Sequence, residues 1–161
     1  MLCYDNYQML IRPTTFMANH KPLTLTSPKQ RQGNLFEQQA CEFLQAKGLR
    51  LVAKNWQQPK LGELDLVMIE TGSAWSTLVF IEVRQRKRSA YGDAAISITA
   101  GKQRKVVKTA QSFLQQHPEY ADYDCRFDVI AYNTLGSILL KDDTSDTQPE
   151  WIKGAFVARA W

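Results

Sequence analysis

One short segment near the middle of the chain most constrains the fold. Leu78 to Val83 is apolar on both of its alternating faces, and Glu82 is its one charged residue. Side chains of a strand point alternately to its two faces, and a strand apolar on both faces is usually buried in a sheet that is covered on both sides. We therefore expect a central strand here, and a carboxylate at Glu82 that has a specific task, because burying a charge is costly.

The flanking sequence predicts helices and strands around this central strand. Apolar residues at helical spacing, a capping box at Ser27 and a stop at Gly48 indicate a first helix. β-branched and aromatic runs separated by turn residues indicate the strands. The expected elements are a helix over 28–47, an antiparallel meander of strands over 49–56, 63–69 and 77–84, a helix over 99–117 and a strand over 126–132, with 137–140 a further candidate strand and 151–157 a last strand or a packing segment.

This order of elements predicts an α/β or α+β protein with a mixed sheet and helices packed against it. Residues 1–26 show neither helical nor strand periodicity and are expected to form a flexible leader, whereas 27–161 are expected to form one domain. With 161 residues, of which 44% are hydrophobic and 22% charged, the chain can bury a core of its own. Its apolar stretches fall well short of the roughly 20 residues that cross a bilayer.

The three cysteines lie far apart without a CxxC spacing, so reduced thiols and a cytoplasmic location are expected. Charge is unevenly distributed along the chain. Between Arg84 and Lys108 there are eight basic residues and one acid, whereas the whole chain carries only +4. Such a window is typical of a face that meets phosphates, although solvated basic helix faces are also common.

Four polar residues on two neighbouring strands can carry chemistry. By strand alternation, Glu63 and Asp65 share one face of the second strand, and Glu82 and Arg84 share one face of the third. If the two faces coincide, three carboxylates converge, and such oxygens suit a hard cation such as Mg²⁺. The alternative is a solvated edge with a cross-strand ion pair, which spacing alone favours. The apolar surroundings of Glu82 count against that alternative.

Several ordered blocks of the chain form a recognisable pattern. The two main blocks are 62–67, GELDLV, and 79–86, VFIEVRQR. The supporting blocks, from the first helix to the end of the chain, are 33–40, 55–56, 91–92, 102–104, 126–129 and 154–156. In these blocks the chain resembles the YraN family of small bacterial proteins, which looks like a branch of the PD-(D/E)xK nuclease superfamily that includes archaeal Holliday-junction resolvases. The resemblance covers about residues 31 to 156.

The resemblance implies a restriction-endonuclease-like core of helix, three strands, helix and strand, with a C-terminal extension. Asp65 and Glu82 would then be ligands of Mg²⁺ or Mn²⁺, with Glu37 as a further ligand or a water-mediated contact. Arg84 occupies the position of the catalytic lysine, and a guanidinium is a poor general base because it does not lose its proton. Arg84 would instead bind the scissile phosphate and stabilise charge.

In the same superfamily reading, Gln103 would orient water or phosphate, and Glu63 would support the site. An acid such as Asp128 more often bonds an arginine or caps a helix than acts in catalysis. The residues expected to contact nucleic acid are Arg84, Arg86, Lys87, Arg88, Lys102, Arg104 and Lys105.

Three functional hypotheses remain open from the sequence. The first is a Mg²⁺-dependent endonuclease that acts on DNA in repair or recombination. The second is a non-catalytic nuclease-fold module that binds DNA within a larger DNA-processing complex. The third is a structural protein whose four polar residues form a buried charge network. A homodimer is compatible with the first two.

Overall fold

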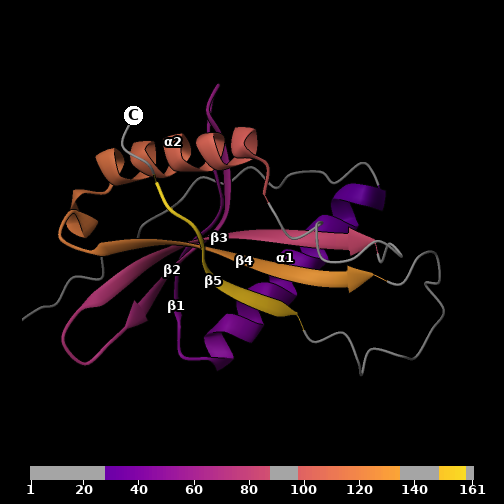
Figure 1. The fold of residues 1–161 in the computed structure, drawn as a ribbon, viewed down its shortest axis with the longest axis horizontal. Helices are drawn as coiled ribbons and strands as arrows, with labels where there is room; N and C mark the ends of the chain where they lie inside the picture. The colour runs from indigo at the N-terminus through magenta and orange to yellow at the C-terminus, as the bar shows by residue number, and fades with distance from the viewer. Residues whose placement is uncertain (1–27, 88–97, 135–148, 159–161) are drawn as a thin grey trace, which may run out of the picture.

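The structure is a computed structural model that describes residues 28–87, 98–134 and 149–158. The elements in chain order are α1 (Pro28–Ala46), β1 (Arg50–Gln58), β2 (Gly62–Thr71), β3 (Ser76–Lys87), α2 (Ala100–Gln116), the 3₁₀ turn η2 (Pro118–Tyr120), β4 (Asp124–Thr134) and β5 (Glu150–Phe156) (Figure 1). The expected leader, the 137–140 candidate strand and the 91–92 turn lie outside the described residues.

The five strands form one mixed sheet in the order β1-β2-β3-β4-β5. β1, β2 and β3 pair antiparallel, as the meander prediction requires, and β5 pairs antiparallel with β4. β3 and β4 pair parallel, and a parallel pair needs a crossover connection, which here contains α2. The predicted α/β class is therefore confirmed. The segment expected as a last strand or packing segment is the edge strand β5.

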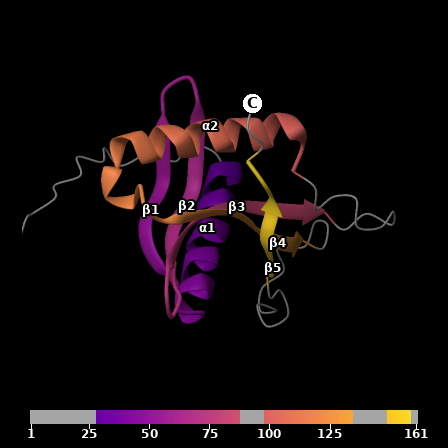
Figure 2. The ribbon, with the colours of Figure 1, turned by 60° about the vertical axis from the view of Figure 1, so that its left-hand side comes forward.

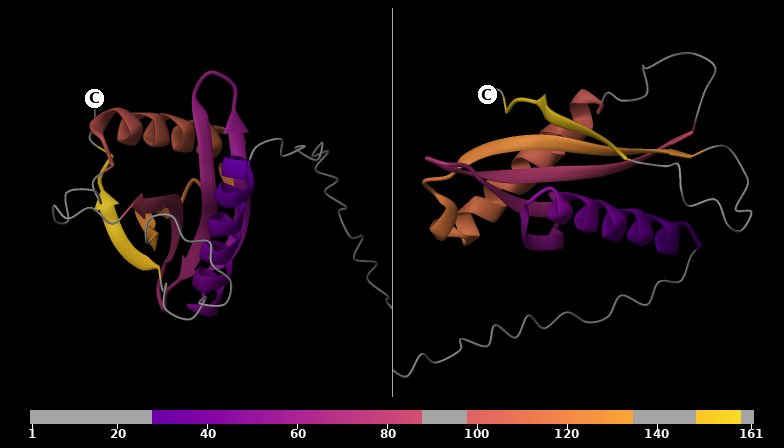
Figure 3. Two further views of the ribbon diagram at one scale, coloured as in Figure 1. Left: turned by 90° about the vertical axis from the view of Figure 1, so that its right-hand side faces the viewer. Right: turned by 90° about the horizontal axis from the view of Figure 1, so that it is seen from below.

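Both faces of the central strands are buried, which explains their nearly continuous apolar sequence. Met68 and Val79 belong to the core on the α1 face, together with Leu44 of that helix. Val67 and Phe80 belong to the core on the α2 face, where Phe113 packs edge-on against the Phe80 ring. The two helices cover different sides of the sheet (Figure 3).

The sheet forks between β2 and β3, and this fork positions the candidate site. The hydrogen-bonded ladder between these strands ends at Leu66 opposite Ile81. Beyond that point β2 continues beside β1 as far as Gly62, and β3 continues beside β4 as far as Lys87. The β1–β2 hairpin runs upward past α2, whereas β3 and β4 point away to the right (Figure 2).

α2 spans Ala100–Gln116, within one residue at each end of the helix predicted over 99–117. Thr99 is the N-cap residue and its side-chain oxygen accepts a hydrogen bond from the Lys102 backbone N–H at 3.3 Å. At the other end His117 is the C-cap residue, immediately before Pro118. None of the helices in the described ranges is long and apolar enough to cross a membrane.

Candidate functional site

Asp65 and Glu82 face the same side of the sheet at the fork between β2 and β3. Val67 and Phe80 are paired across the two antiparallel strands. Asp65 lies two residues before Val67 and Glu82 lies two residues after Phe80, so both acids share the face of that pair. Both acids are buried, with 8% and 5% of their surface exposed. Where the backbone ladder has ended, Asp65 Oδ2 accepts a hydrogen bond from the Val83 N–H at 2.8 Å. At the fork, the Val83 N–H thus donates to the Asp65 carboxylate, beyond the last backbone pair of β2 and β3.

Two cations lie beside Glu82. The closer one is Lys102 of α2, whose Nζ is 2.9 Å from Glu82 Oε1. Nη1 of Arg84 is 3.8 Å from the same oxygen, and the Arg84 side chain is 43% exposed. The sequence predicted Lys102 only as a phosphate contact. Its contact with Glu82 was missed because it joins elements 20 residues apart in the sequence, and no local pattern signals such a pair.

The electrostatics of the pair are unfavourable to a second negative charge. Burial, and after it the neighbouring Glu82 carboxylate, raise the pKa of Asp65 to about 7 against the opposing effects of the Val83 N–H and the Lys102 ammonium. Near neutral pH Asp65 is therefore poised between its protonated and ionised forms. A cation bound beside the two carboxylates would favour the ionised form.

Glu37 of α1 reaches the same electrostatic neighbourhood from the other side of the sheet. Burial raises its pKa, a side-chain hydrogen bond with Asn55 lowers it, and the charges of Glu63 and Glu82 raise it. Asn55 holds a φ of 51°, a left-handed conformation that asparagine tolerates better than most residues. Glu37 Oε2 is buried without a hydrogen-bond partner among the described residues. Such an atom has an unmet need for a donor or a cation.

The remaining acid and amide predicted at the site lie further out. Glu63 is exposed on β2, where its Oε2 accepts a hydrogen bond from Gln57 Nε2 at 3.4 Å. Gln103 Nε2 donates to the Ile98 carbonyl at 2.9 Å and so ties the first turn of α2 to the segment before it. The role of Gln103 in orienting water or phosphate and that of Glu63 in supporting the site stay predictions.

The predicted phosphate contacts divide between two segments. Arg104 and Lys105 are exposed on α2. Arg86 and Lys87 form the last residues of β3, and their side chains, like the whole of Arg88, lie outside the described part.

The donor set of the three carboxylates can be tested against a divalent cation. Within the described ranges, no group of three or more His, Cys, Asp or Glu side chains forms a ready-made metal centre. Mg²⁺, however, is usually bound by one or two carboxylates together with waters and substrate phosphates, not by a complete protein cage. Asp65 and Glu82 match that pattern, and the unpartnered Oε2 of Glu37 adds a third candidate oxygen. The residues therefore fit such an ion.

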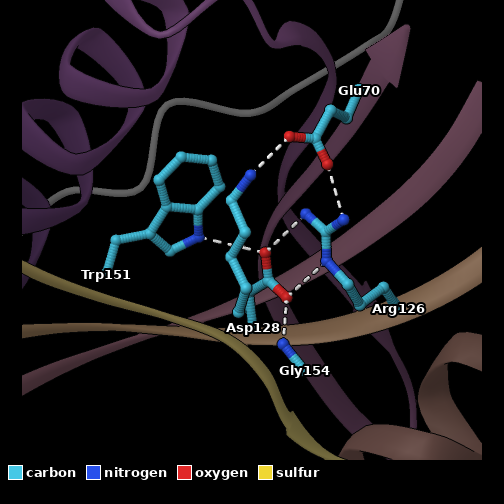
Figure 4. A network of polar contacts seen from close by, with 6 residues as sticks. Glu70, Arg126, Asp128, Trp151 and Gly154 are labelled. Atoms are coloured by element: carbon cyan, nitrogen blue, oxygen red, sulfur yellow. Dashed lines mark hydrogen bonds and ion pairs between the residues drawn. The ribbon is translucent and has the colours of Figure 1, made fainter. Parts of the chain in front are cut away.

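Asp128 takes part in a separate network on the opposite face of the sheet (Figure 4). Its side chain is fully buried, and it accepts two hydrogen bonds from Arg126, at 2.8 and 2.9 Å, in a bidentate pair. The Trp151 indole N–H donates to it at 3.0 Å and the Gly154 backbone N–H at 2.9 Å. The prediction that Asp128 bonds an arginine is confirmed.

Glu70 of β2 extends this network. It accepts a hydrogen bond from Arg126 Nη1 at 2.5 Å and one from Lys153 Nζ at 2.7 Å. Burial alone would raise its pKa, but the hydrogen bonds from the two cations outweigh burial and lower it. The sequence did not predict this network, because its members come from β2, β4 and β5.

A mixed five-stranded sheet with a helix on each face is consistent with the restriction-endonuclease-like class of fold. The chain belongs to the uncharacterised protein family UPF0102, whose family model matches residues 36–132, and this is the YraN group that its motifs resemble.

Related proteins carry the same family name. The UPF0102 proteins of Psychrobacter arcticus and Psychrobacter cryohalolentis are 62% and 63% identical to this chain, with alignments that cover the whole of both chains. The UPF0102 protein of Pseudomonas syringae pv. tomato is 47% identical over 81% of this chain and 95% of that protein.

Proposed function

We propose that this protein binds nucleic acid, foremost DNA, and hydrolyses its phosphodiester bonds with a divalent cation. The observation that carries the proposal is the placement of Asp65 and Glu82 side by side in a buried fork of the sheet, with the pKa of Asp65 raised to about 7. Carboxylates so placed repel each other unless a cation or a proton lies between them.

The chain's own residues would divide the work at this site. Asp65 and Glu82, with Glu37 beside them, would hold Mg²⁺ or Mn²⁺, and the bound ion supplies Lewis-acid polarisation and an activated water. The exposed guanidinium of Arg84 can donate two parallel hydrogen bonds to a phosphate and stabilise developing charge, but it cannot accept a proton. Lys102 neutralises and orients Glu82.

A second candidate is a module that binds DNA without cleaving it. Two observations favour it: a guanidinium stands in the position of the superfamily lysine, and Lys102 already pairs with Glu82. Arg84 and Lys102 can bind phosphate whether or not the protein hydrolyses the bound nucleic acid. The two candidates therefore differ in hydrolysis and not in binding.

The deciding experiment incubates the protein with branched, nicked, single-stranded and duplex DNA in Mg²⁺ or Mn²⁺. Asp65→Asn with Glu82→Gln keeps the shape of both side chains and removes their charges. We expect cleavage by the wild type and a loss of at least about a hundredfold in the double variant. DNA binding by the wild type without any cleavage would favour the second candidate. If the wild type neither binds nor cleaves DNA, both candidate functions are overturned.

Metal binding without DNA gives a readout independent of activity. Titration with Mn²⁺ by calorimetry should show tighter binding as the pH rises through about 7, because Asp65 must lose its proton to bind a cation. Glu37→Gln should weaken binding, whereas Glu42→Gln, an exposed acid of the same helix, is the matched control and should not. Equal effects of these two variants would remove Glu37 from the site.

A further inference from the structure

An open groove of about 740 Å³ lies between the turn of the β1–β2 hairpin and the N-terminal half of α2. Gln57, Lys60 and Glu63 line it from the hairpin, and Lys102 and Lys105 line it from the helix. The sequence marked the hairpin turn only as a connection between strands, so the groove and the part that Lys60 plays in it come from the structure alone.

The two walls of the groove are joined at one end. Gln116 Nε2, near the end of α2, donates to Gln58 Oε1 at 3.0 Å. Closer to the groove, Gly62 approaches α2 so tightly that a Cβ there would lie 3.3 Å from Thr109 Oγ1. Both contacts are C-terminal to the part of α2 that lines the groove. The hairpin and the helix thus hold each other at a fixed separation.

The charges of the groove fit a phosphate chain better than a base or an apolar ligand. Three of the described lining residues are lysines, Lys60 on the hairpin and Lys102 and Lys105 on the helix, against one acid, Glu63. No aromatic ring is found among the described residues that line it, so bases have nothing to stack on. Ammonium groups on both walls can contact successive phosphates from two sides.

Lys102 connects the groove to the carboxylate pair. Its side chain lines the groove, and its Nζ is 2.9 Å from Glu82 Oε1. A strand whose phosphates lie against Lys60 and Lys105 would therefore continue directly toward Glu82 and Asp65.

We propose that this groove binds the phosphate backbone of one nucleic-acid strand without regard to base sequence, and leads that strand to the carboxylate pair. The inference rests on the proposed function for the nature of the ligand, and it adds which surface of the molecule holds the strand. It also separates the basic residues of α2 into two groups. Lys105 contacts phosphate, whereas Arg104 and Lys108, both exposed but absent from the described groove lining, do not. For Arg104 this revises the expectation from the sequence, which grouped it with the nucleic-acid contacts.

The test compares two charge-matched double variants. Lys60→Gln with Lys105→Gln removes two positive charges from the groove, and Arg104→Gln with Lys108→Gln removes two from the rest of the same helix. All four residues are exposed, so both variants should melt with the wild type. Lys102 is left intact because it contacts Glu82.

Binding of single-stranded oligonucleotides of uniform and mixed sequence, and of a duplex, is measured by fluorescence anisotropy over a series of salt concentrations, in Ca²⁺ or EDTA. The groove variant should bind all of them roughly tenfold more weakly, and its salt slope for single strands should fall by about 1.4, near 0.7 for each lost phosphate contact. The control variant should keep the wild-type slope.

Three outcomes would overturn the inference. Equal losses in the two double variants would mean that diffuse surface charge binds the nucleic acid. A strong preference for one base sequence would mean that bases are read. Unchanged binding in the groove variant would mean that the strand lies elsewhere. In all three cases the wild type still binds, whereas failure of the proposed function appears as no binding, or no cleavage, by the wild type itself.

Discussion

The two acidic clusters of this protein occupy the same sheet and are built in opposite ways. Asp128, on the α1 face, is fully buried and has donors on every side, namely the two from Arg126 and one each from Trp151 and Gly154. Asp65, on the α2 face, is also buried, but among the described residues its hydrogen-bond donor is the Val83 N–H. One acid is satisfied by its own fold, and the other is held in a state that a ligand would complete.

This difference lies in how the free-energy cost of a buried carboxylate is offset. A buried charge costs free energy unless it is paired and hydrogen-bonded. The network of Asp128 offsets that cost internally, and it joins the edge strand β5 to the sheet. The pair of Asp65 and Glu82 is only partly compensated, and the raised pKa of Asp65 reflects the remaining free-energy cost of its charge. Sites that bind ions or substrates commonly carry such perturbed groups.

The largest effect should follow from breaking the satisfied cluster. Asp128→Ala leaves the Arg126 guanidinium without its bidentate partner and two further donors without an acceptor, so the free energy of unfolding should fall by about 3 to 5 kcal/mol. Urea denaturation of the wild type and the variant measures this loss in the free energy of unfolding. Asp128→Asn keeps an acceptor oxygen and should cost less. A loss below about 1 kcal/mol in the alanine variant would contradict the structural role of the network.

The unsatisfied cluster should respond in the opposite direction. Burial and Glu82 raise the pKa of Asp65 from 3.8 to about 7, so the folded state binds its proton more tightly than the unfolded state does. Stability from this group is full at low pH and is lost as the pH rises toward 7, by up to about 1.4 kcal/mol per pH unit. Asp65→Asn removes the ionisation, and at pH 8 in EDTA it should unfold with a free energy roughly 2 kcal/mol higher than the wild type.

The control for this prediction is the pH itself. At pH 4 the wild-type Asp65 is protonated, and the advantage of Asp65→Asn should disappear. Adding Mn²⁺ at pH 8 should stabilise the wild type and not the variant, because only the ionised carboxylate attracts the cation. A variant that is equally stable to the wild type at pH 4 and pH 8 would show that Asp65 is not strained.

The sequence predicted much of this contrast for reasons that are local. Strand alternation placed Asp65 and Glu82 on one face, and the apolar run around Glu82 indicated that a carboxylate is buried there. The helical spacing of apolar residues before Pro118 predicted a helix over 99–117, and α2 spans Ala100–Gln116. These signals need only residues near one another in the chain.

The parts that escaped prediction depend on contacts between distant segments. No spacing rule joins Glu70 to Lys153, which are 83 residues apart, because their meeting depends on the order of strands in the sheet. The fork between β2 and β3 escaped for the same reason, since both strands read as regular β-structure throughout. The place of Lys60 in the groove was not predicted, because a turn sequence indicates a backbone conformation and not which distant segment lies beside it.

The smallest of these effects tests whether the two clusters titrate in opposite directions. Hydrogen bonds from Lys153 and Arg126 outweigh burial and lower the pKa of Glu70, so its contribution to stability is present above pH 4.5 and is lost as the pH falls through its folded value. Glu70→Gln should therefore cost about 1 kcal/mol at pH 7 and less at pH 3. Lys153→Met, which removes a half-exposed partner, should cost less still. Thermal unfolding at the two pH values measures both variants, and a Glu70→Gln variant whose deficit grows toward acid pH would contradict the opposition between the clusters.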